Sequence, residues 1–448
     1  MRSRITAWRR WVAAGALTLT VGLLAACGGS SSSNDSKAPT SARGPIAGTL
    51  TFYNFQPTGN EGRWWDDFVA RFEAKYPRTH IKVTKYATQD YWIKTLAAFS
   101  SGNEPDIFIP DAGEDLNKYI RAGRIAPLDR ILDLSYYNRA AVEPFRAING
   151  HVNAIPIFSY EILGWANEDL LAKNGLAVPR TWDELLNACG KLSAAGVVPL
   201  AMGNAGQDRF PTEHLMDTLL YQLAGNRAAL NATYGIDGAS WTDDAVVRAG
   251  AAMRQLIDAR CFPEGFTGLS YAQMTNLFAQ GKAAMTFTGS WFAAQVQTSR
   301  VKFRSTTFPF PDVPGAAHST ANLDGILGGV TGLTASGKAA NRNPALVAAF
   351  LNEFGKRVDD YANATGALSV AASPNPTGGT LQRDMAEVFK SVGELVPVSD
   401  TILPKPITEA YEGDIVSLTA GKLTPEAWAK SIADTTRREQ ANLPRLDG

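Results

Sequence analysis

A regular alternation of short apolar runs and amphipathic segments near the start of the chain is the feature that most restricts its fold. Residues 50–53 alternate like a β-strand, and apolar side chains in residues 65–72 then recur at the spacing of one helix face. A second strand pattern follows at 81–83, a second helix pattern at 91–99, and a short apolar strand pattern at 105–109. Parallel strands are joined by helices, so this β-α-β-α-β order predicts an α/β domain.

The alternation continues through the rest of the chain. Residues 153–158 favour an extended run, and Thr181 with Glu184 has the spacing of a capping box that starts a helix. Further elements are expected as helices at 245–257, at 271–278 after Ser270 and Gln273, from Pro344 to near Gly355 and after Pro425, and as a strand at 283–288. An α/β architecture is therefore expected over most of the chain.

The N-terminal segment is read as an export signal and excluded from the fold. Four arginines lie within residues 1–10, an uncharged stretch runs over 11–26, and small residues lead into Cys27. This order resembles the bacterial lipobox, in which the cysteine is acylated and becomes the new N-terminus. An ordinary secretory signal with an incidental Cys27 is the alternative, and Arg9-Arg10 leaves the export route open between the general and twin-arginine pathways. Residues 27–45 then form a polar tether, which predicts a domain held at the outer face of the cytoplasmic membrane.

Net charge, chain length and the two remaining cysteines limit the possible partners, the number of lobes and the covalent links of the protein. Removal of the four N-terminal arginines leaves 39 basic against 43 acidic residues, a net charge of −4, which does not attract a nucleic-acid backbone. The roughly 400 remaining residues exceed one ordinary domain, so two lobes are expected. Cys189 and Cys261 form either a disulfide or two buried thiols, and the sequence does not decide between them.

Several features imitate catalytic chemistry. Residues 332–338 have the glycine and lysine spacing of a phosphate-binding loop, but Ala339 stands where that loop needs a hydroxyl, so we expect a strand end and loop here. The four histidines share no metal-ligand spacing, and no nucleophile elbow occurs. We predict no cofactor, no metal and no enzymatic activity. A surface-anchored carbohydrate-active enzyme remains the alternative, because a glycosidase carboxylate pair is defined only by its separation in space.

Four segments, taken in order, resemble family 1 extracellular solute-binding proteins, the family that includes maltose-binding protein. They are 102–108 (Gly-Asn-Glu-Pro-Asp-Ile-Phe), 155–156 with 163–171, 178–185 (Val-Pro-Arg-Thr-Trp-Asp-Glu-Leu), and 281–291, which ends in Gly-Ser-Trp. Trp165-Ala166 departs from the usual aromatic placement of the family, and the segment from Thr380 onward resembles it only weakly.

The resemblance implies a two-lobed α/β fold of the type II periplasmic-binding-protein kind, with the ligand in a cleft between lobes joined by hinge crossings. Lobe 1 would be 46–155 plus 327–368, and lobe 2 would be 156–326 plus 369–448. The implied function is sugar or oligosaccharide binding by a monomeric lipoprotein that closes on its ligand and delivers it to the permease of an ABC importer.

Ligand-binding candidates come from this resemblance and from the rule that loops after strand ends contact ligands in open α/β sheets. The resemblance places Trp291 at a stacking position and Asp111 and Tyr160 at ligand positions. The full set of candidates is Trp291, Asp111, Tyr160, Asn54, Phe55, Gln56, Glu61, Gln207, Arg209, Phe210, Asp324, Gly328 and Gly329. We expect 207–210 to form a polar-aromatic cluster in a glycine-rich loop, and Gly328 and Gly329 to allow close backbone approach to the ligand.

Overall fold

The computed structural model describes residues 36–39, 41–56, 59–146, 148–206, 208–299, 301–377 and 380–445. The predicted signal peptide, Cys27 and the first part of the predicted tether lie outside the described residues. In the described end of the tether, Pro39 is buried and the Lys37 carbonyl accepts a hydrogen bond from the Asn341 side chain (3.1 Å). This end of the tether therefore packs on the folded domain, because Pro39 gives it apolar surface to bury.

The N-terminal part of the chain forms the first part of the sheet. Its elements are β1 (Gly48–Asn54), α1 (Gly59–Lys75), β2 (Thr79–Lys85), α2 (Thr88–Ser100), β3 (Ile107–Phe108), α3 (Glu114–Arg121) and α4 (Arg139–Val142). β1 pairs in parallel with both β2 and β3, which confirms the predicted β-α-β-α-β order. Leu50 and Phe52 of β1 are fully buried, and the Phe52 ring packs edge-on against Trp65 of α1 (5.0 Å between centroids).

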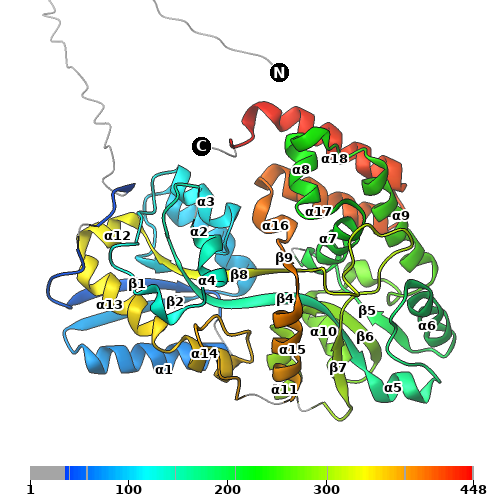
Figure 1. The fold of residues 1–448 in the computed structure, drawn as a ribbon, viewed down its shortest axis with the longest axis horizontal. Helices are drawn as coiled ribbons and strands as arrows, with labels where there is room; N and C mark the ends of the chain where they lie inside the picture. The colour runs from blue at the N-terminus through cyan, green and yellow to red at the C-terminus, as the bar shows by residue number, and fades with distance from the viewer. Residues whose placement is uncertain are drawn as a thin grey trace, which may run out of the picture. The chain divides into compact units, whose positions relative to one another are not determined.

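Two long antiparallel strands join this part of the sheet to the second. β4 (Ile155–Asn167) and β8 (Gly325–Ala335) pair from Ile155 to Glu161 and run side by side in Figure 1. β8 also pairs with β3, whereas β4 continues beyond β8 and pairs with β6 (Ala283–Gly289). Every residue of β4 is buried, and the strand extends well beyond the extended run that we expected at 153–158.

The second part of the sheet combines β4 and β6 with strands from the middle of the chain. The remaining elements here are α5 (Glu168–Lys173), α6 (Trp182–Ala194), β5 (Val198–Ala201), α7 (Phe210–Ala224), α8 (Ala228–Tyr234), α9 (Asp244–Asp258), α10 (Tyr271–Ala279), α11 (Phe292–Thr298) and β7 (Ser305–Phe308). The capping box of Ser270 and Gln273 is complete. The predicted box at Thr181 is half formed, because the Glu184 carboxylate accepts from the Arg180 N–H and not from Thr181.

A disulfide joins α6 to the segment after α9. Cys189 and Cys261 are fully buried and bonded, with their Cα atoms 4.6 Å apart. The structure therefore selects the disulfide from the two alternatives that the sequence left open.

The C-terminal part adds helices to both parts of the sheet. Its elements are α12 (Gly337–Arg342), α13 (Pro344–Gly355), α14 (Val358–Thr365), α15 (Thr380–Ser391), β9 (Glu394–Val396), α16 (Ser399–Ile402), α17 (Lys405–Thr419) and α18 (Pro425–Glu439). α17 and α18 pack against each other and against α9. The expected loop at 332–338 is wrong at its end, because α12 begins at Gly337, where the Ser336 side chain caps it. None of the helices within the described residues has the length and apolar character of a membrane span.

Candidate functional site

One face of the β4–β8 pair carries most of the candidate residues. Tyr160 of β4 lies opposite Gly329 of β8, and Phe158 lies opposite Thr331. Side chains alternate along a strand, and residues directly opposite each other point to the same side. These four residues therefore share one face, which we call the site face, while Glu161 points to the other.

Trp291 lies next to Tyr160 because of the turn that follows β6. The Glu161 N–H donates to the Ser290 hydroxyl (3.3 Å), and the Ser290 N–H donates to the Glu161 carbonyl (2.8 Å). These bonds hold the Gly-Ser-Trp turn against β4. A Cβ atom on Gly289 would lie 2.1 Å from the indole ring, so only glycine lets the ring fold back over the strand end.

Trp291 is the centre of an aromatic group. Its ring meets Tyr160 at 5.3 Å between centroids, His214 at 6.2 Å and Phe210 at 6.4 Å. The indole N–H donates to the Tyr271 hydroxyl (2.7 Å), which fixes the ring orientation. Trp291, Phe210 and Tyr271 are each half-buried, so their rings keep surface for a ligand.

Tyr160 is held tightly against β8. A Cβ on Gly329 would lie 2.5 Å from the Tyr160 hydroxyl and 2.7 Å from its Cζ. The close approach that we expected at Gly329 is made by the protein's own Tyr160. Gly328 faces the other side, where a Cβ would meet Leu395. Both glycines lie inside a strand and not in a turn.

Asp111 joins the site face from the loop after β3. It pairs through its backbone with Thr331, whose hydroxyl donates to the Asp111 carboxylate (2.6 Å). Its pKa is raised to about 7, first by burial and then by the charge of Asp115. Asp115 itself is paired with Lys118.

Glu213 and His214 are neighbouring buried titratable side chains of helix α7. Glu213 is fully buried, and its pKa is raised well above the usual value by burial and then by the charges of neighbouring acids. The Glu213 carboxyl lies against that of Glu412 of α17, and no other described residue donates to it. Burial lowers the pKa of His214 to about 3, so its imidazole is neutral at physiological pH, and its Nδ1 has no hydrogen-bond partner among the described residues.

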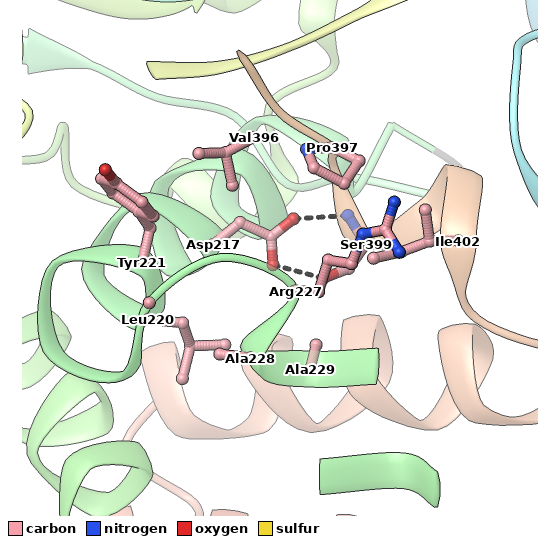
Figure 2. A pocket seen from close by; sticks show the side chains of 11 residues that line it. Asp217, Leu220, Tyr221, Arg227, Ala228, Ala229, Val396, Pro397, Ser399 and Ile402 are labelled. Atoms are coloured by element: carbon pink, nitrogen blue, oxygen red, sulfur yellow. Dashed lines mark hydrogen bonds between the residues drawn. The ribbon is translucent and has the colours of Figure 1, made fainter. Parts of the chain in front are cut away.

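The segment that contains α16 packs against helix α7 and bonds Asp217 of that helix. Figure 2 shows the Asp217 carboxylate bonded to the backbone N–H (2.7 Å) and hydroxyl (2.6 Å) of Ser399, and it also accepts from the Tyr411 hydroxyl (2.8 Å). The next residue, Asp400, has an exposed side chain, yet burial within the protein raises its pKa well above the usual value. α16 also packs against the start of α3, near Asp111.

The predicted residues after β1 form a second group. The Asn54 side chain is fully buried and accepts from the Gln56 N–H (2.8 Å), so the protein itself uses this amide. Gln56 Oε1 accepts from the Trp65 indole (2.8 Å) and the Tyr361 hydroxyl (2.9 Å).

Phe55 packs on Tyr91 and Trp92. Burial raises the pKa of Glu61, whose charge also acts on Tyr361. Tyr361 meets Phe158 (6.2 Å), which connects this group to the site face.

The remaining predicted residues lie in different parts of the structure. Gln207 lies outside the described residues. Phe210 is the first residue of α7 and Arg209 directly precedes it, so the glycine-rich loop that we expected over 207–210 ends before Phe210. Asp324 is exposed just before β8, where its carbonyl accepts from the Glu394 N–H (3.0 Å) and its charge acts on Tyr221. It does not join the Trp291 group.

Five side chains of the candidate site were not predicted from the sequence: Glu213, His214, Tyr271, Asp400 and Glu412. α7 is buried from Pro211 to Leu223, so it has no polar face and no helical periodicity to detect. Asp400 and Glu412 lie in the C-terminal segment, where the resemblance was weak. Tyr271 was recognised as a helix residue, and only its position facing Trp291 reveals its role.

The comparisons with known proteins agree with this architecture. The family model for bacterial extracellular solute-binding proteins matches residues 56–356. The chain belongs to this family. An uncharacterized ABC transporter extracellular-binding protein of Pyrococcus horikoshii is 26% identical over 219 residues, which cover 47% of this chain and 48% of that protein. A multiple sugar-binding protein of Streptococcus mutans is 25% identical over 301 residues, 66% of this chain and 68% of that protein.

A solved structure confirms the fold class. A chitin oligosaccharide binding protein superposes with a TM-score of 0.79 at 24% identity, covering 88% of this chain and 99% of that one. The predicted two-lobed α/β fold of the type II periplasmic-binding-protein kind is therefore correct.

Proposed function

We propose that the protein is the sugar-binding component of an ABC importer and binds a sugar or oligosaccharide on the site face of β4 and β8. The observation that carries this proposal is the Trp291 group, whose half-buried aromatic rings lie beside Tyr160 on the face that also holds the Asp111 carboxylate. Aromatic faces stack on the C–H surface of a sugar, and carboxylates accept hydrogen bonds from paired hydroxyls. The names of the Streptococcus mutans and chitin oligosaccharide binding proteins support the same ligand class.

We propose that the protein closes on its ligand about the two crossing strands. Asp111 reaches the site from the part of the chain before β4, whereas Trp291, Phe210 and Glu213 come from the part after it. We propose lobes at 46–155 plus 327–368 and at 156–326 plus 369–448, which hinge at β4 and β8 and trap the ligand between Asp111 and Trp291. The closed form would then dock on the permease as a monomer.

The test is a panel of neutral and charged mono- and oligosaccharides in a thermal-shift screen, followed by calorimetric titration. A ligand at 100 times its Kd stabilises the folded state by about 2.7 kcal/mol, so binding raises the melting temperature. Each binding sugar is then incubated with the protein and analysed for products. Binding without product supports a receptor, whereas hydrolysis would favour the carbohydrate-active enzyme.

Anchoring is tested separately. We propose that acylation of Cys27 holds the protein at the outer face of the cytoplasmic membrane. Cys27→Ser should release it into the soluble fraction with unchanged sugar affinity, because the change lies outside the site. A variant that stays in the membrane fraction would contradict the lipid anchor.

A further inference from the structure

We propose that the surface formed by the docked end of the tether and by helix α12 faces the membrane, and that a short leash of chain holds it there. We call this surface, residues 36–39 and 41–48 together with α12, the tether face. The inference rests on the proposed acylation of Cys27, because it adds where the lipid surface meets the folded part of the chain. It starts from the tether, which the sequence predicted to continue to residue 45 but which packs on the fold from Lys37 onward.

Hydrogen bonds fix the tether at both ends of its docked segment. The Asn341 side chain at the end of α12 donates to the Lys37 carbonyl (3.1 Å). The Asn343 side chain, which also caps α13, donates to the Ala47 carbonyl (2.8 Å). Two asparagines next to each other in the sequence by two positions therefore hold points of the tether that are ten positions apart.

Apolar contacts support the segment between these two bonds. Pro39 is buried, and Ile46 packs against the hydrophobic core. A Cβ atom on Gly44 would lie 3.5 Å from the Ala345 Cβ, so the backbone passes directly over α13. The docked end of the tether is thus part of the folded structure.

Docking shortens the leash between the proposed lipid and the fold. Lys37 is 10 positions after Cys27, whereas Ile46, at the end of the predicted tether, is 19 positions after it. A fully extended chain spans at most about 3.6 Å per residue, so the leash reaches about 36 Å with the tether docked and about 68 Å without docking.

The width of the folded part decides what these two lengths allow. A compact fold of about 400 residues has a radius of gyration of about 22 Å and is therefore about 55 Å across. If the tether face pointed away from the bilayer, the leash would have to span that width. A leash of about 36 Å is too short to do so, whereas one of about 68 Å is long enough. Docking therefore keeps the tether face on the membrane side.

The charge of the tether face suits a bilayer that contains anionic lipid. Its described residues include no acidic side chain and four exposed basic ones, Lys37, Arg43, Lys338 and Arg342. Arg342 pairs with Asp106 and Lys338 with Glu104, but the exposed fractions of the basic side chains are 58% and 43%, against 12% and 1% for the acids. The positive groups therefore lie outermost, where they attract anionic headgroups.

The first test asks whether the tether is docked, and it uses the Cys27→Ser chain so that lipid plays no part. A nitroxide label on Ala42→Cys reports the motion of the segment, because Ala42 is exposed and Cys189 and Cys261 are bonded to each other. We expect slow label motion. Pro39→Gly combined with Asn341→Ala, which we call the undocked variant, should make the motion fast, because it removes the buried ring and the bond to Lys37.

Asn363→Ala is the matched control for this test. It removes an equivalent bond, from α14 to the Asn375 carbonyl (3.0 Å), away from the tether, and should leave the label slow. Fast motion at Ala42 in the chain without the undocking changes would show that the segment is not docked, and the inference would be wrong whatever happens at Cys27.

The second test measures the height of two sites above the bilayer. The acylated chain is placed on vesicles of equal parts phosphatidylethanolamine and phosphatidylglycerol, and a dye on one introduced cysteine transfers energy to a dye in the lipid. Thr49→Cys lies on β1 beside the tether face, and Ala420→Cys follows α17, which packs on α9 and α18; both positions are exposed. We expect Thr49 to lie at least about 20 Å nearer the bilayer than Ala420, roughly a third of the width of the fold.

Two changes lengthen the leash in different ways. The undocked variant frees the tether, and an insertion of about nine Gly and Ser residues after Ser33 lengthens the leash while the docked segment is kept. Each should reduce the height difference by at least about half, because the leash then exceeds the width of the fold.

The outcomes separate this inference from the lipid anchor. If the chain does not bind the vesicles, the anchor proposal fails and the membrane-facing surface falls with it. If the chain binds and the two labels lie at the same height, the anchor stands and the inference is wrong. A height difference that survives both longer leashes would also overturn the inference, because the orientation would then come from another contact.

Discussion

Trp291→Ala is the sharpest test of the proposed site. Stacking on an indole buries apolar surface of both partners, and a central aromatic anchor contributes about 2 kcal/mol or more, a loss of roughly thirtyfold in affinity on truncation. Neighbouring polar groups exchange water for ligand, so each contributes only about 1 kcal/mol. We therefore expect Trp291→Ala to remove most of the sugar affinity.

The burial of Trp291 also determines how much this variant lowers the free energy of unfolding. Truncation of a fully buried tryptophan to alanine lowers the free energy of unfolding by about 3–5 kcal/mol. Trp291 is half-buried and donates one hydrogen bond, to Tyr271, worth about 1 kcal/mol. We expect a loss of about 2 kcal/mol, which a two-lobed protein of this size survives.

The assay is calorimetric titration and a melting curve on the same preparation, with the sugar found in the panel. Trp291→Phe keeps an aromatic face and loses the indole N–H, so it should retain more affinity than the alanine variant. Trp64→Ala is the control: Trp64 is also half-buried, but it packs on Phe354 and Tyr361 and not on Trp291. It should lower the melting temperature without changing affinity. Unchanged affinity in a folded Trp291→Ala protein would refute the site.

Three further changes address the architecture around the site. Gly329→Ala places a Cβ 2.5 Å from the Tyr160 hydroxyl, so it should cost about 1–3 kcal/mol in urea unfolding and weaken sugar binding by moving that ring. Burial raises the pKa of Glu161 to about 8, so the folded state holds its proton through a window where the unfolded chain releases it. Glu161 alone should therefore lower stability by up to about 1.4 kcal/mol per pH unit as pH rises from about 4.5 to 8, and Glu161→Gln should make the fall in denaturation curves shallower by that amount. Replacing both Cys189 and Cys261 by serine opens a loop with a sequence separation of 72, which should lower the unfolding free energy by about 4 kcal/mol while sugar affinity is kept.

The parts of the fold that the sequence predicted are those with a strong local signal. The β1–β3 unit has alternating or periodic apolar residues, and the helices after Ser270 and Asn343 have capping side chains that the structure confirms. α12 was missed because its six residues are too short for a periodic pattern, and its glycine start resembles a loop. The length of β4 was underestimated because a strand buried on both faces has no alternation.

The sequence predicted the grouping of candidate residues where their positions depend on a local motif. Trp291 and Tyr160 meet, and Asp111 reaches the same face of the crossing strands. The acids of α7 and of the segment after β9 could not be predicted, because they join the site only through packing of helices far apart in the chain. Glu213 and Glu412 are 199 positions apart, a proximity that no local pattern records.

The register of β4 links the site to the crossing strands. Tyr160 and Glu161 are adjacent, yet one faces Trp291 and the other faces the Leu395 side. A shift of one residue would exchange them and place an unpartnered carboxyl against the aromatic group. Ser290 prevents this, because its hydroxyl and N–H bond the two backbone groups of Glu161 and lock the register at the end of β6. The same two bonds that seat Trp291 therefore also fix which face of β4 meets the ligand that we propose, and they couple Trp291 to Tyr160 in the proposed closure.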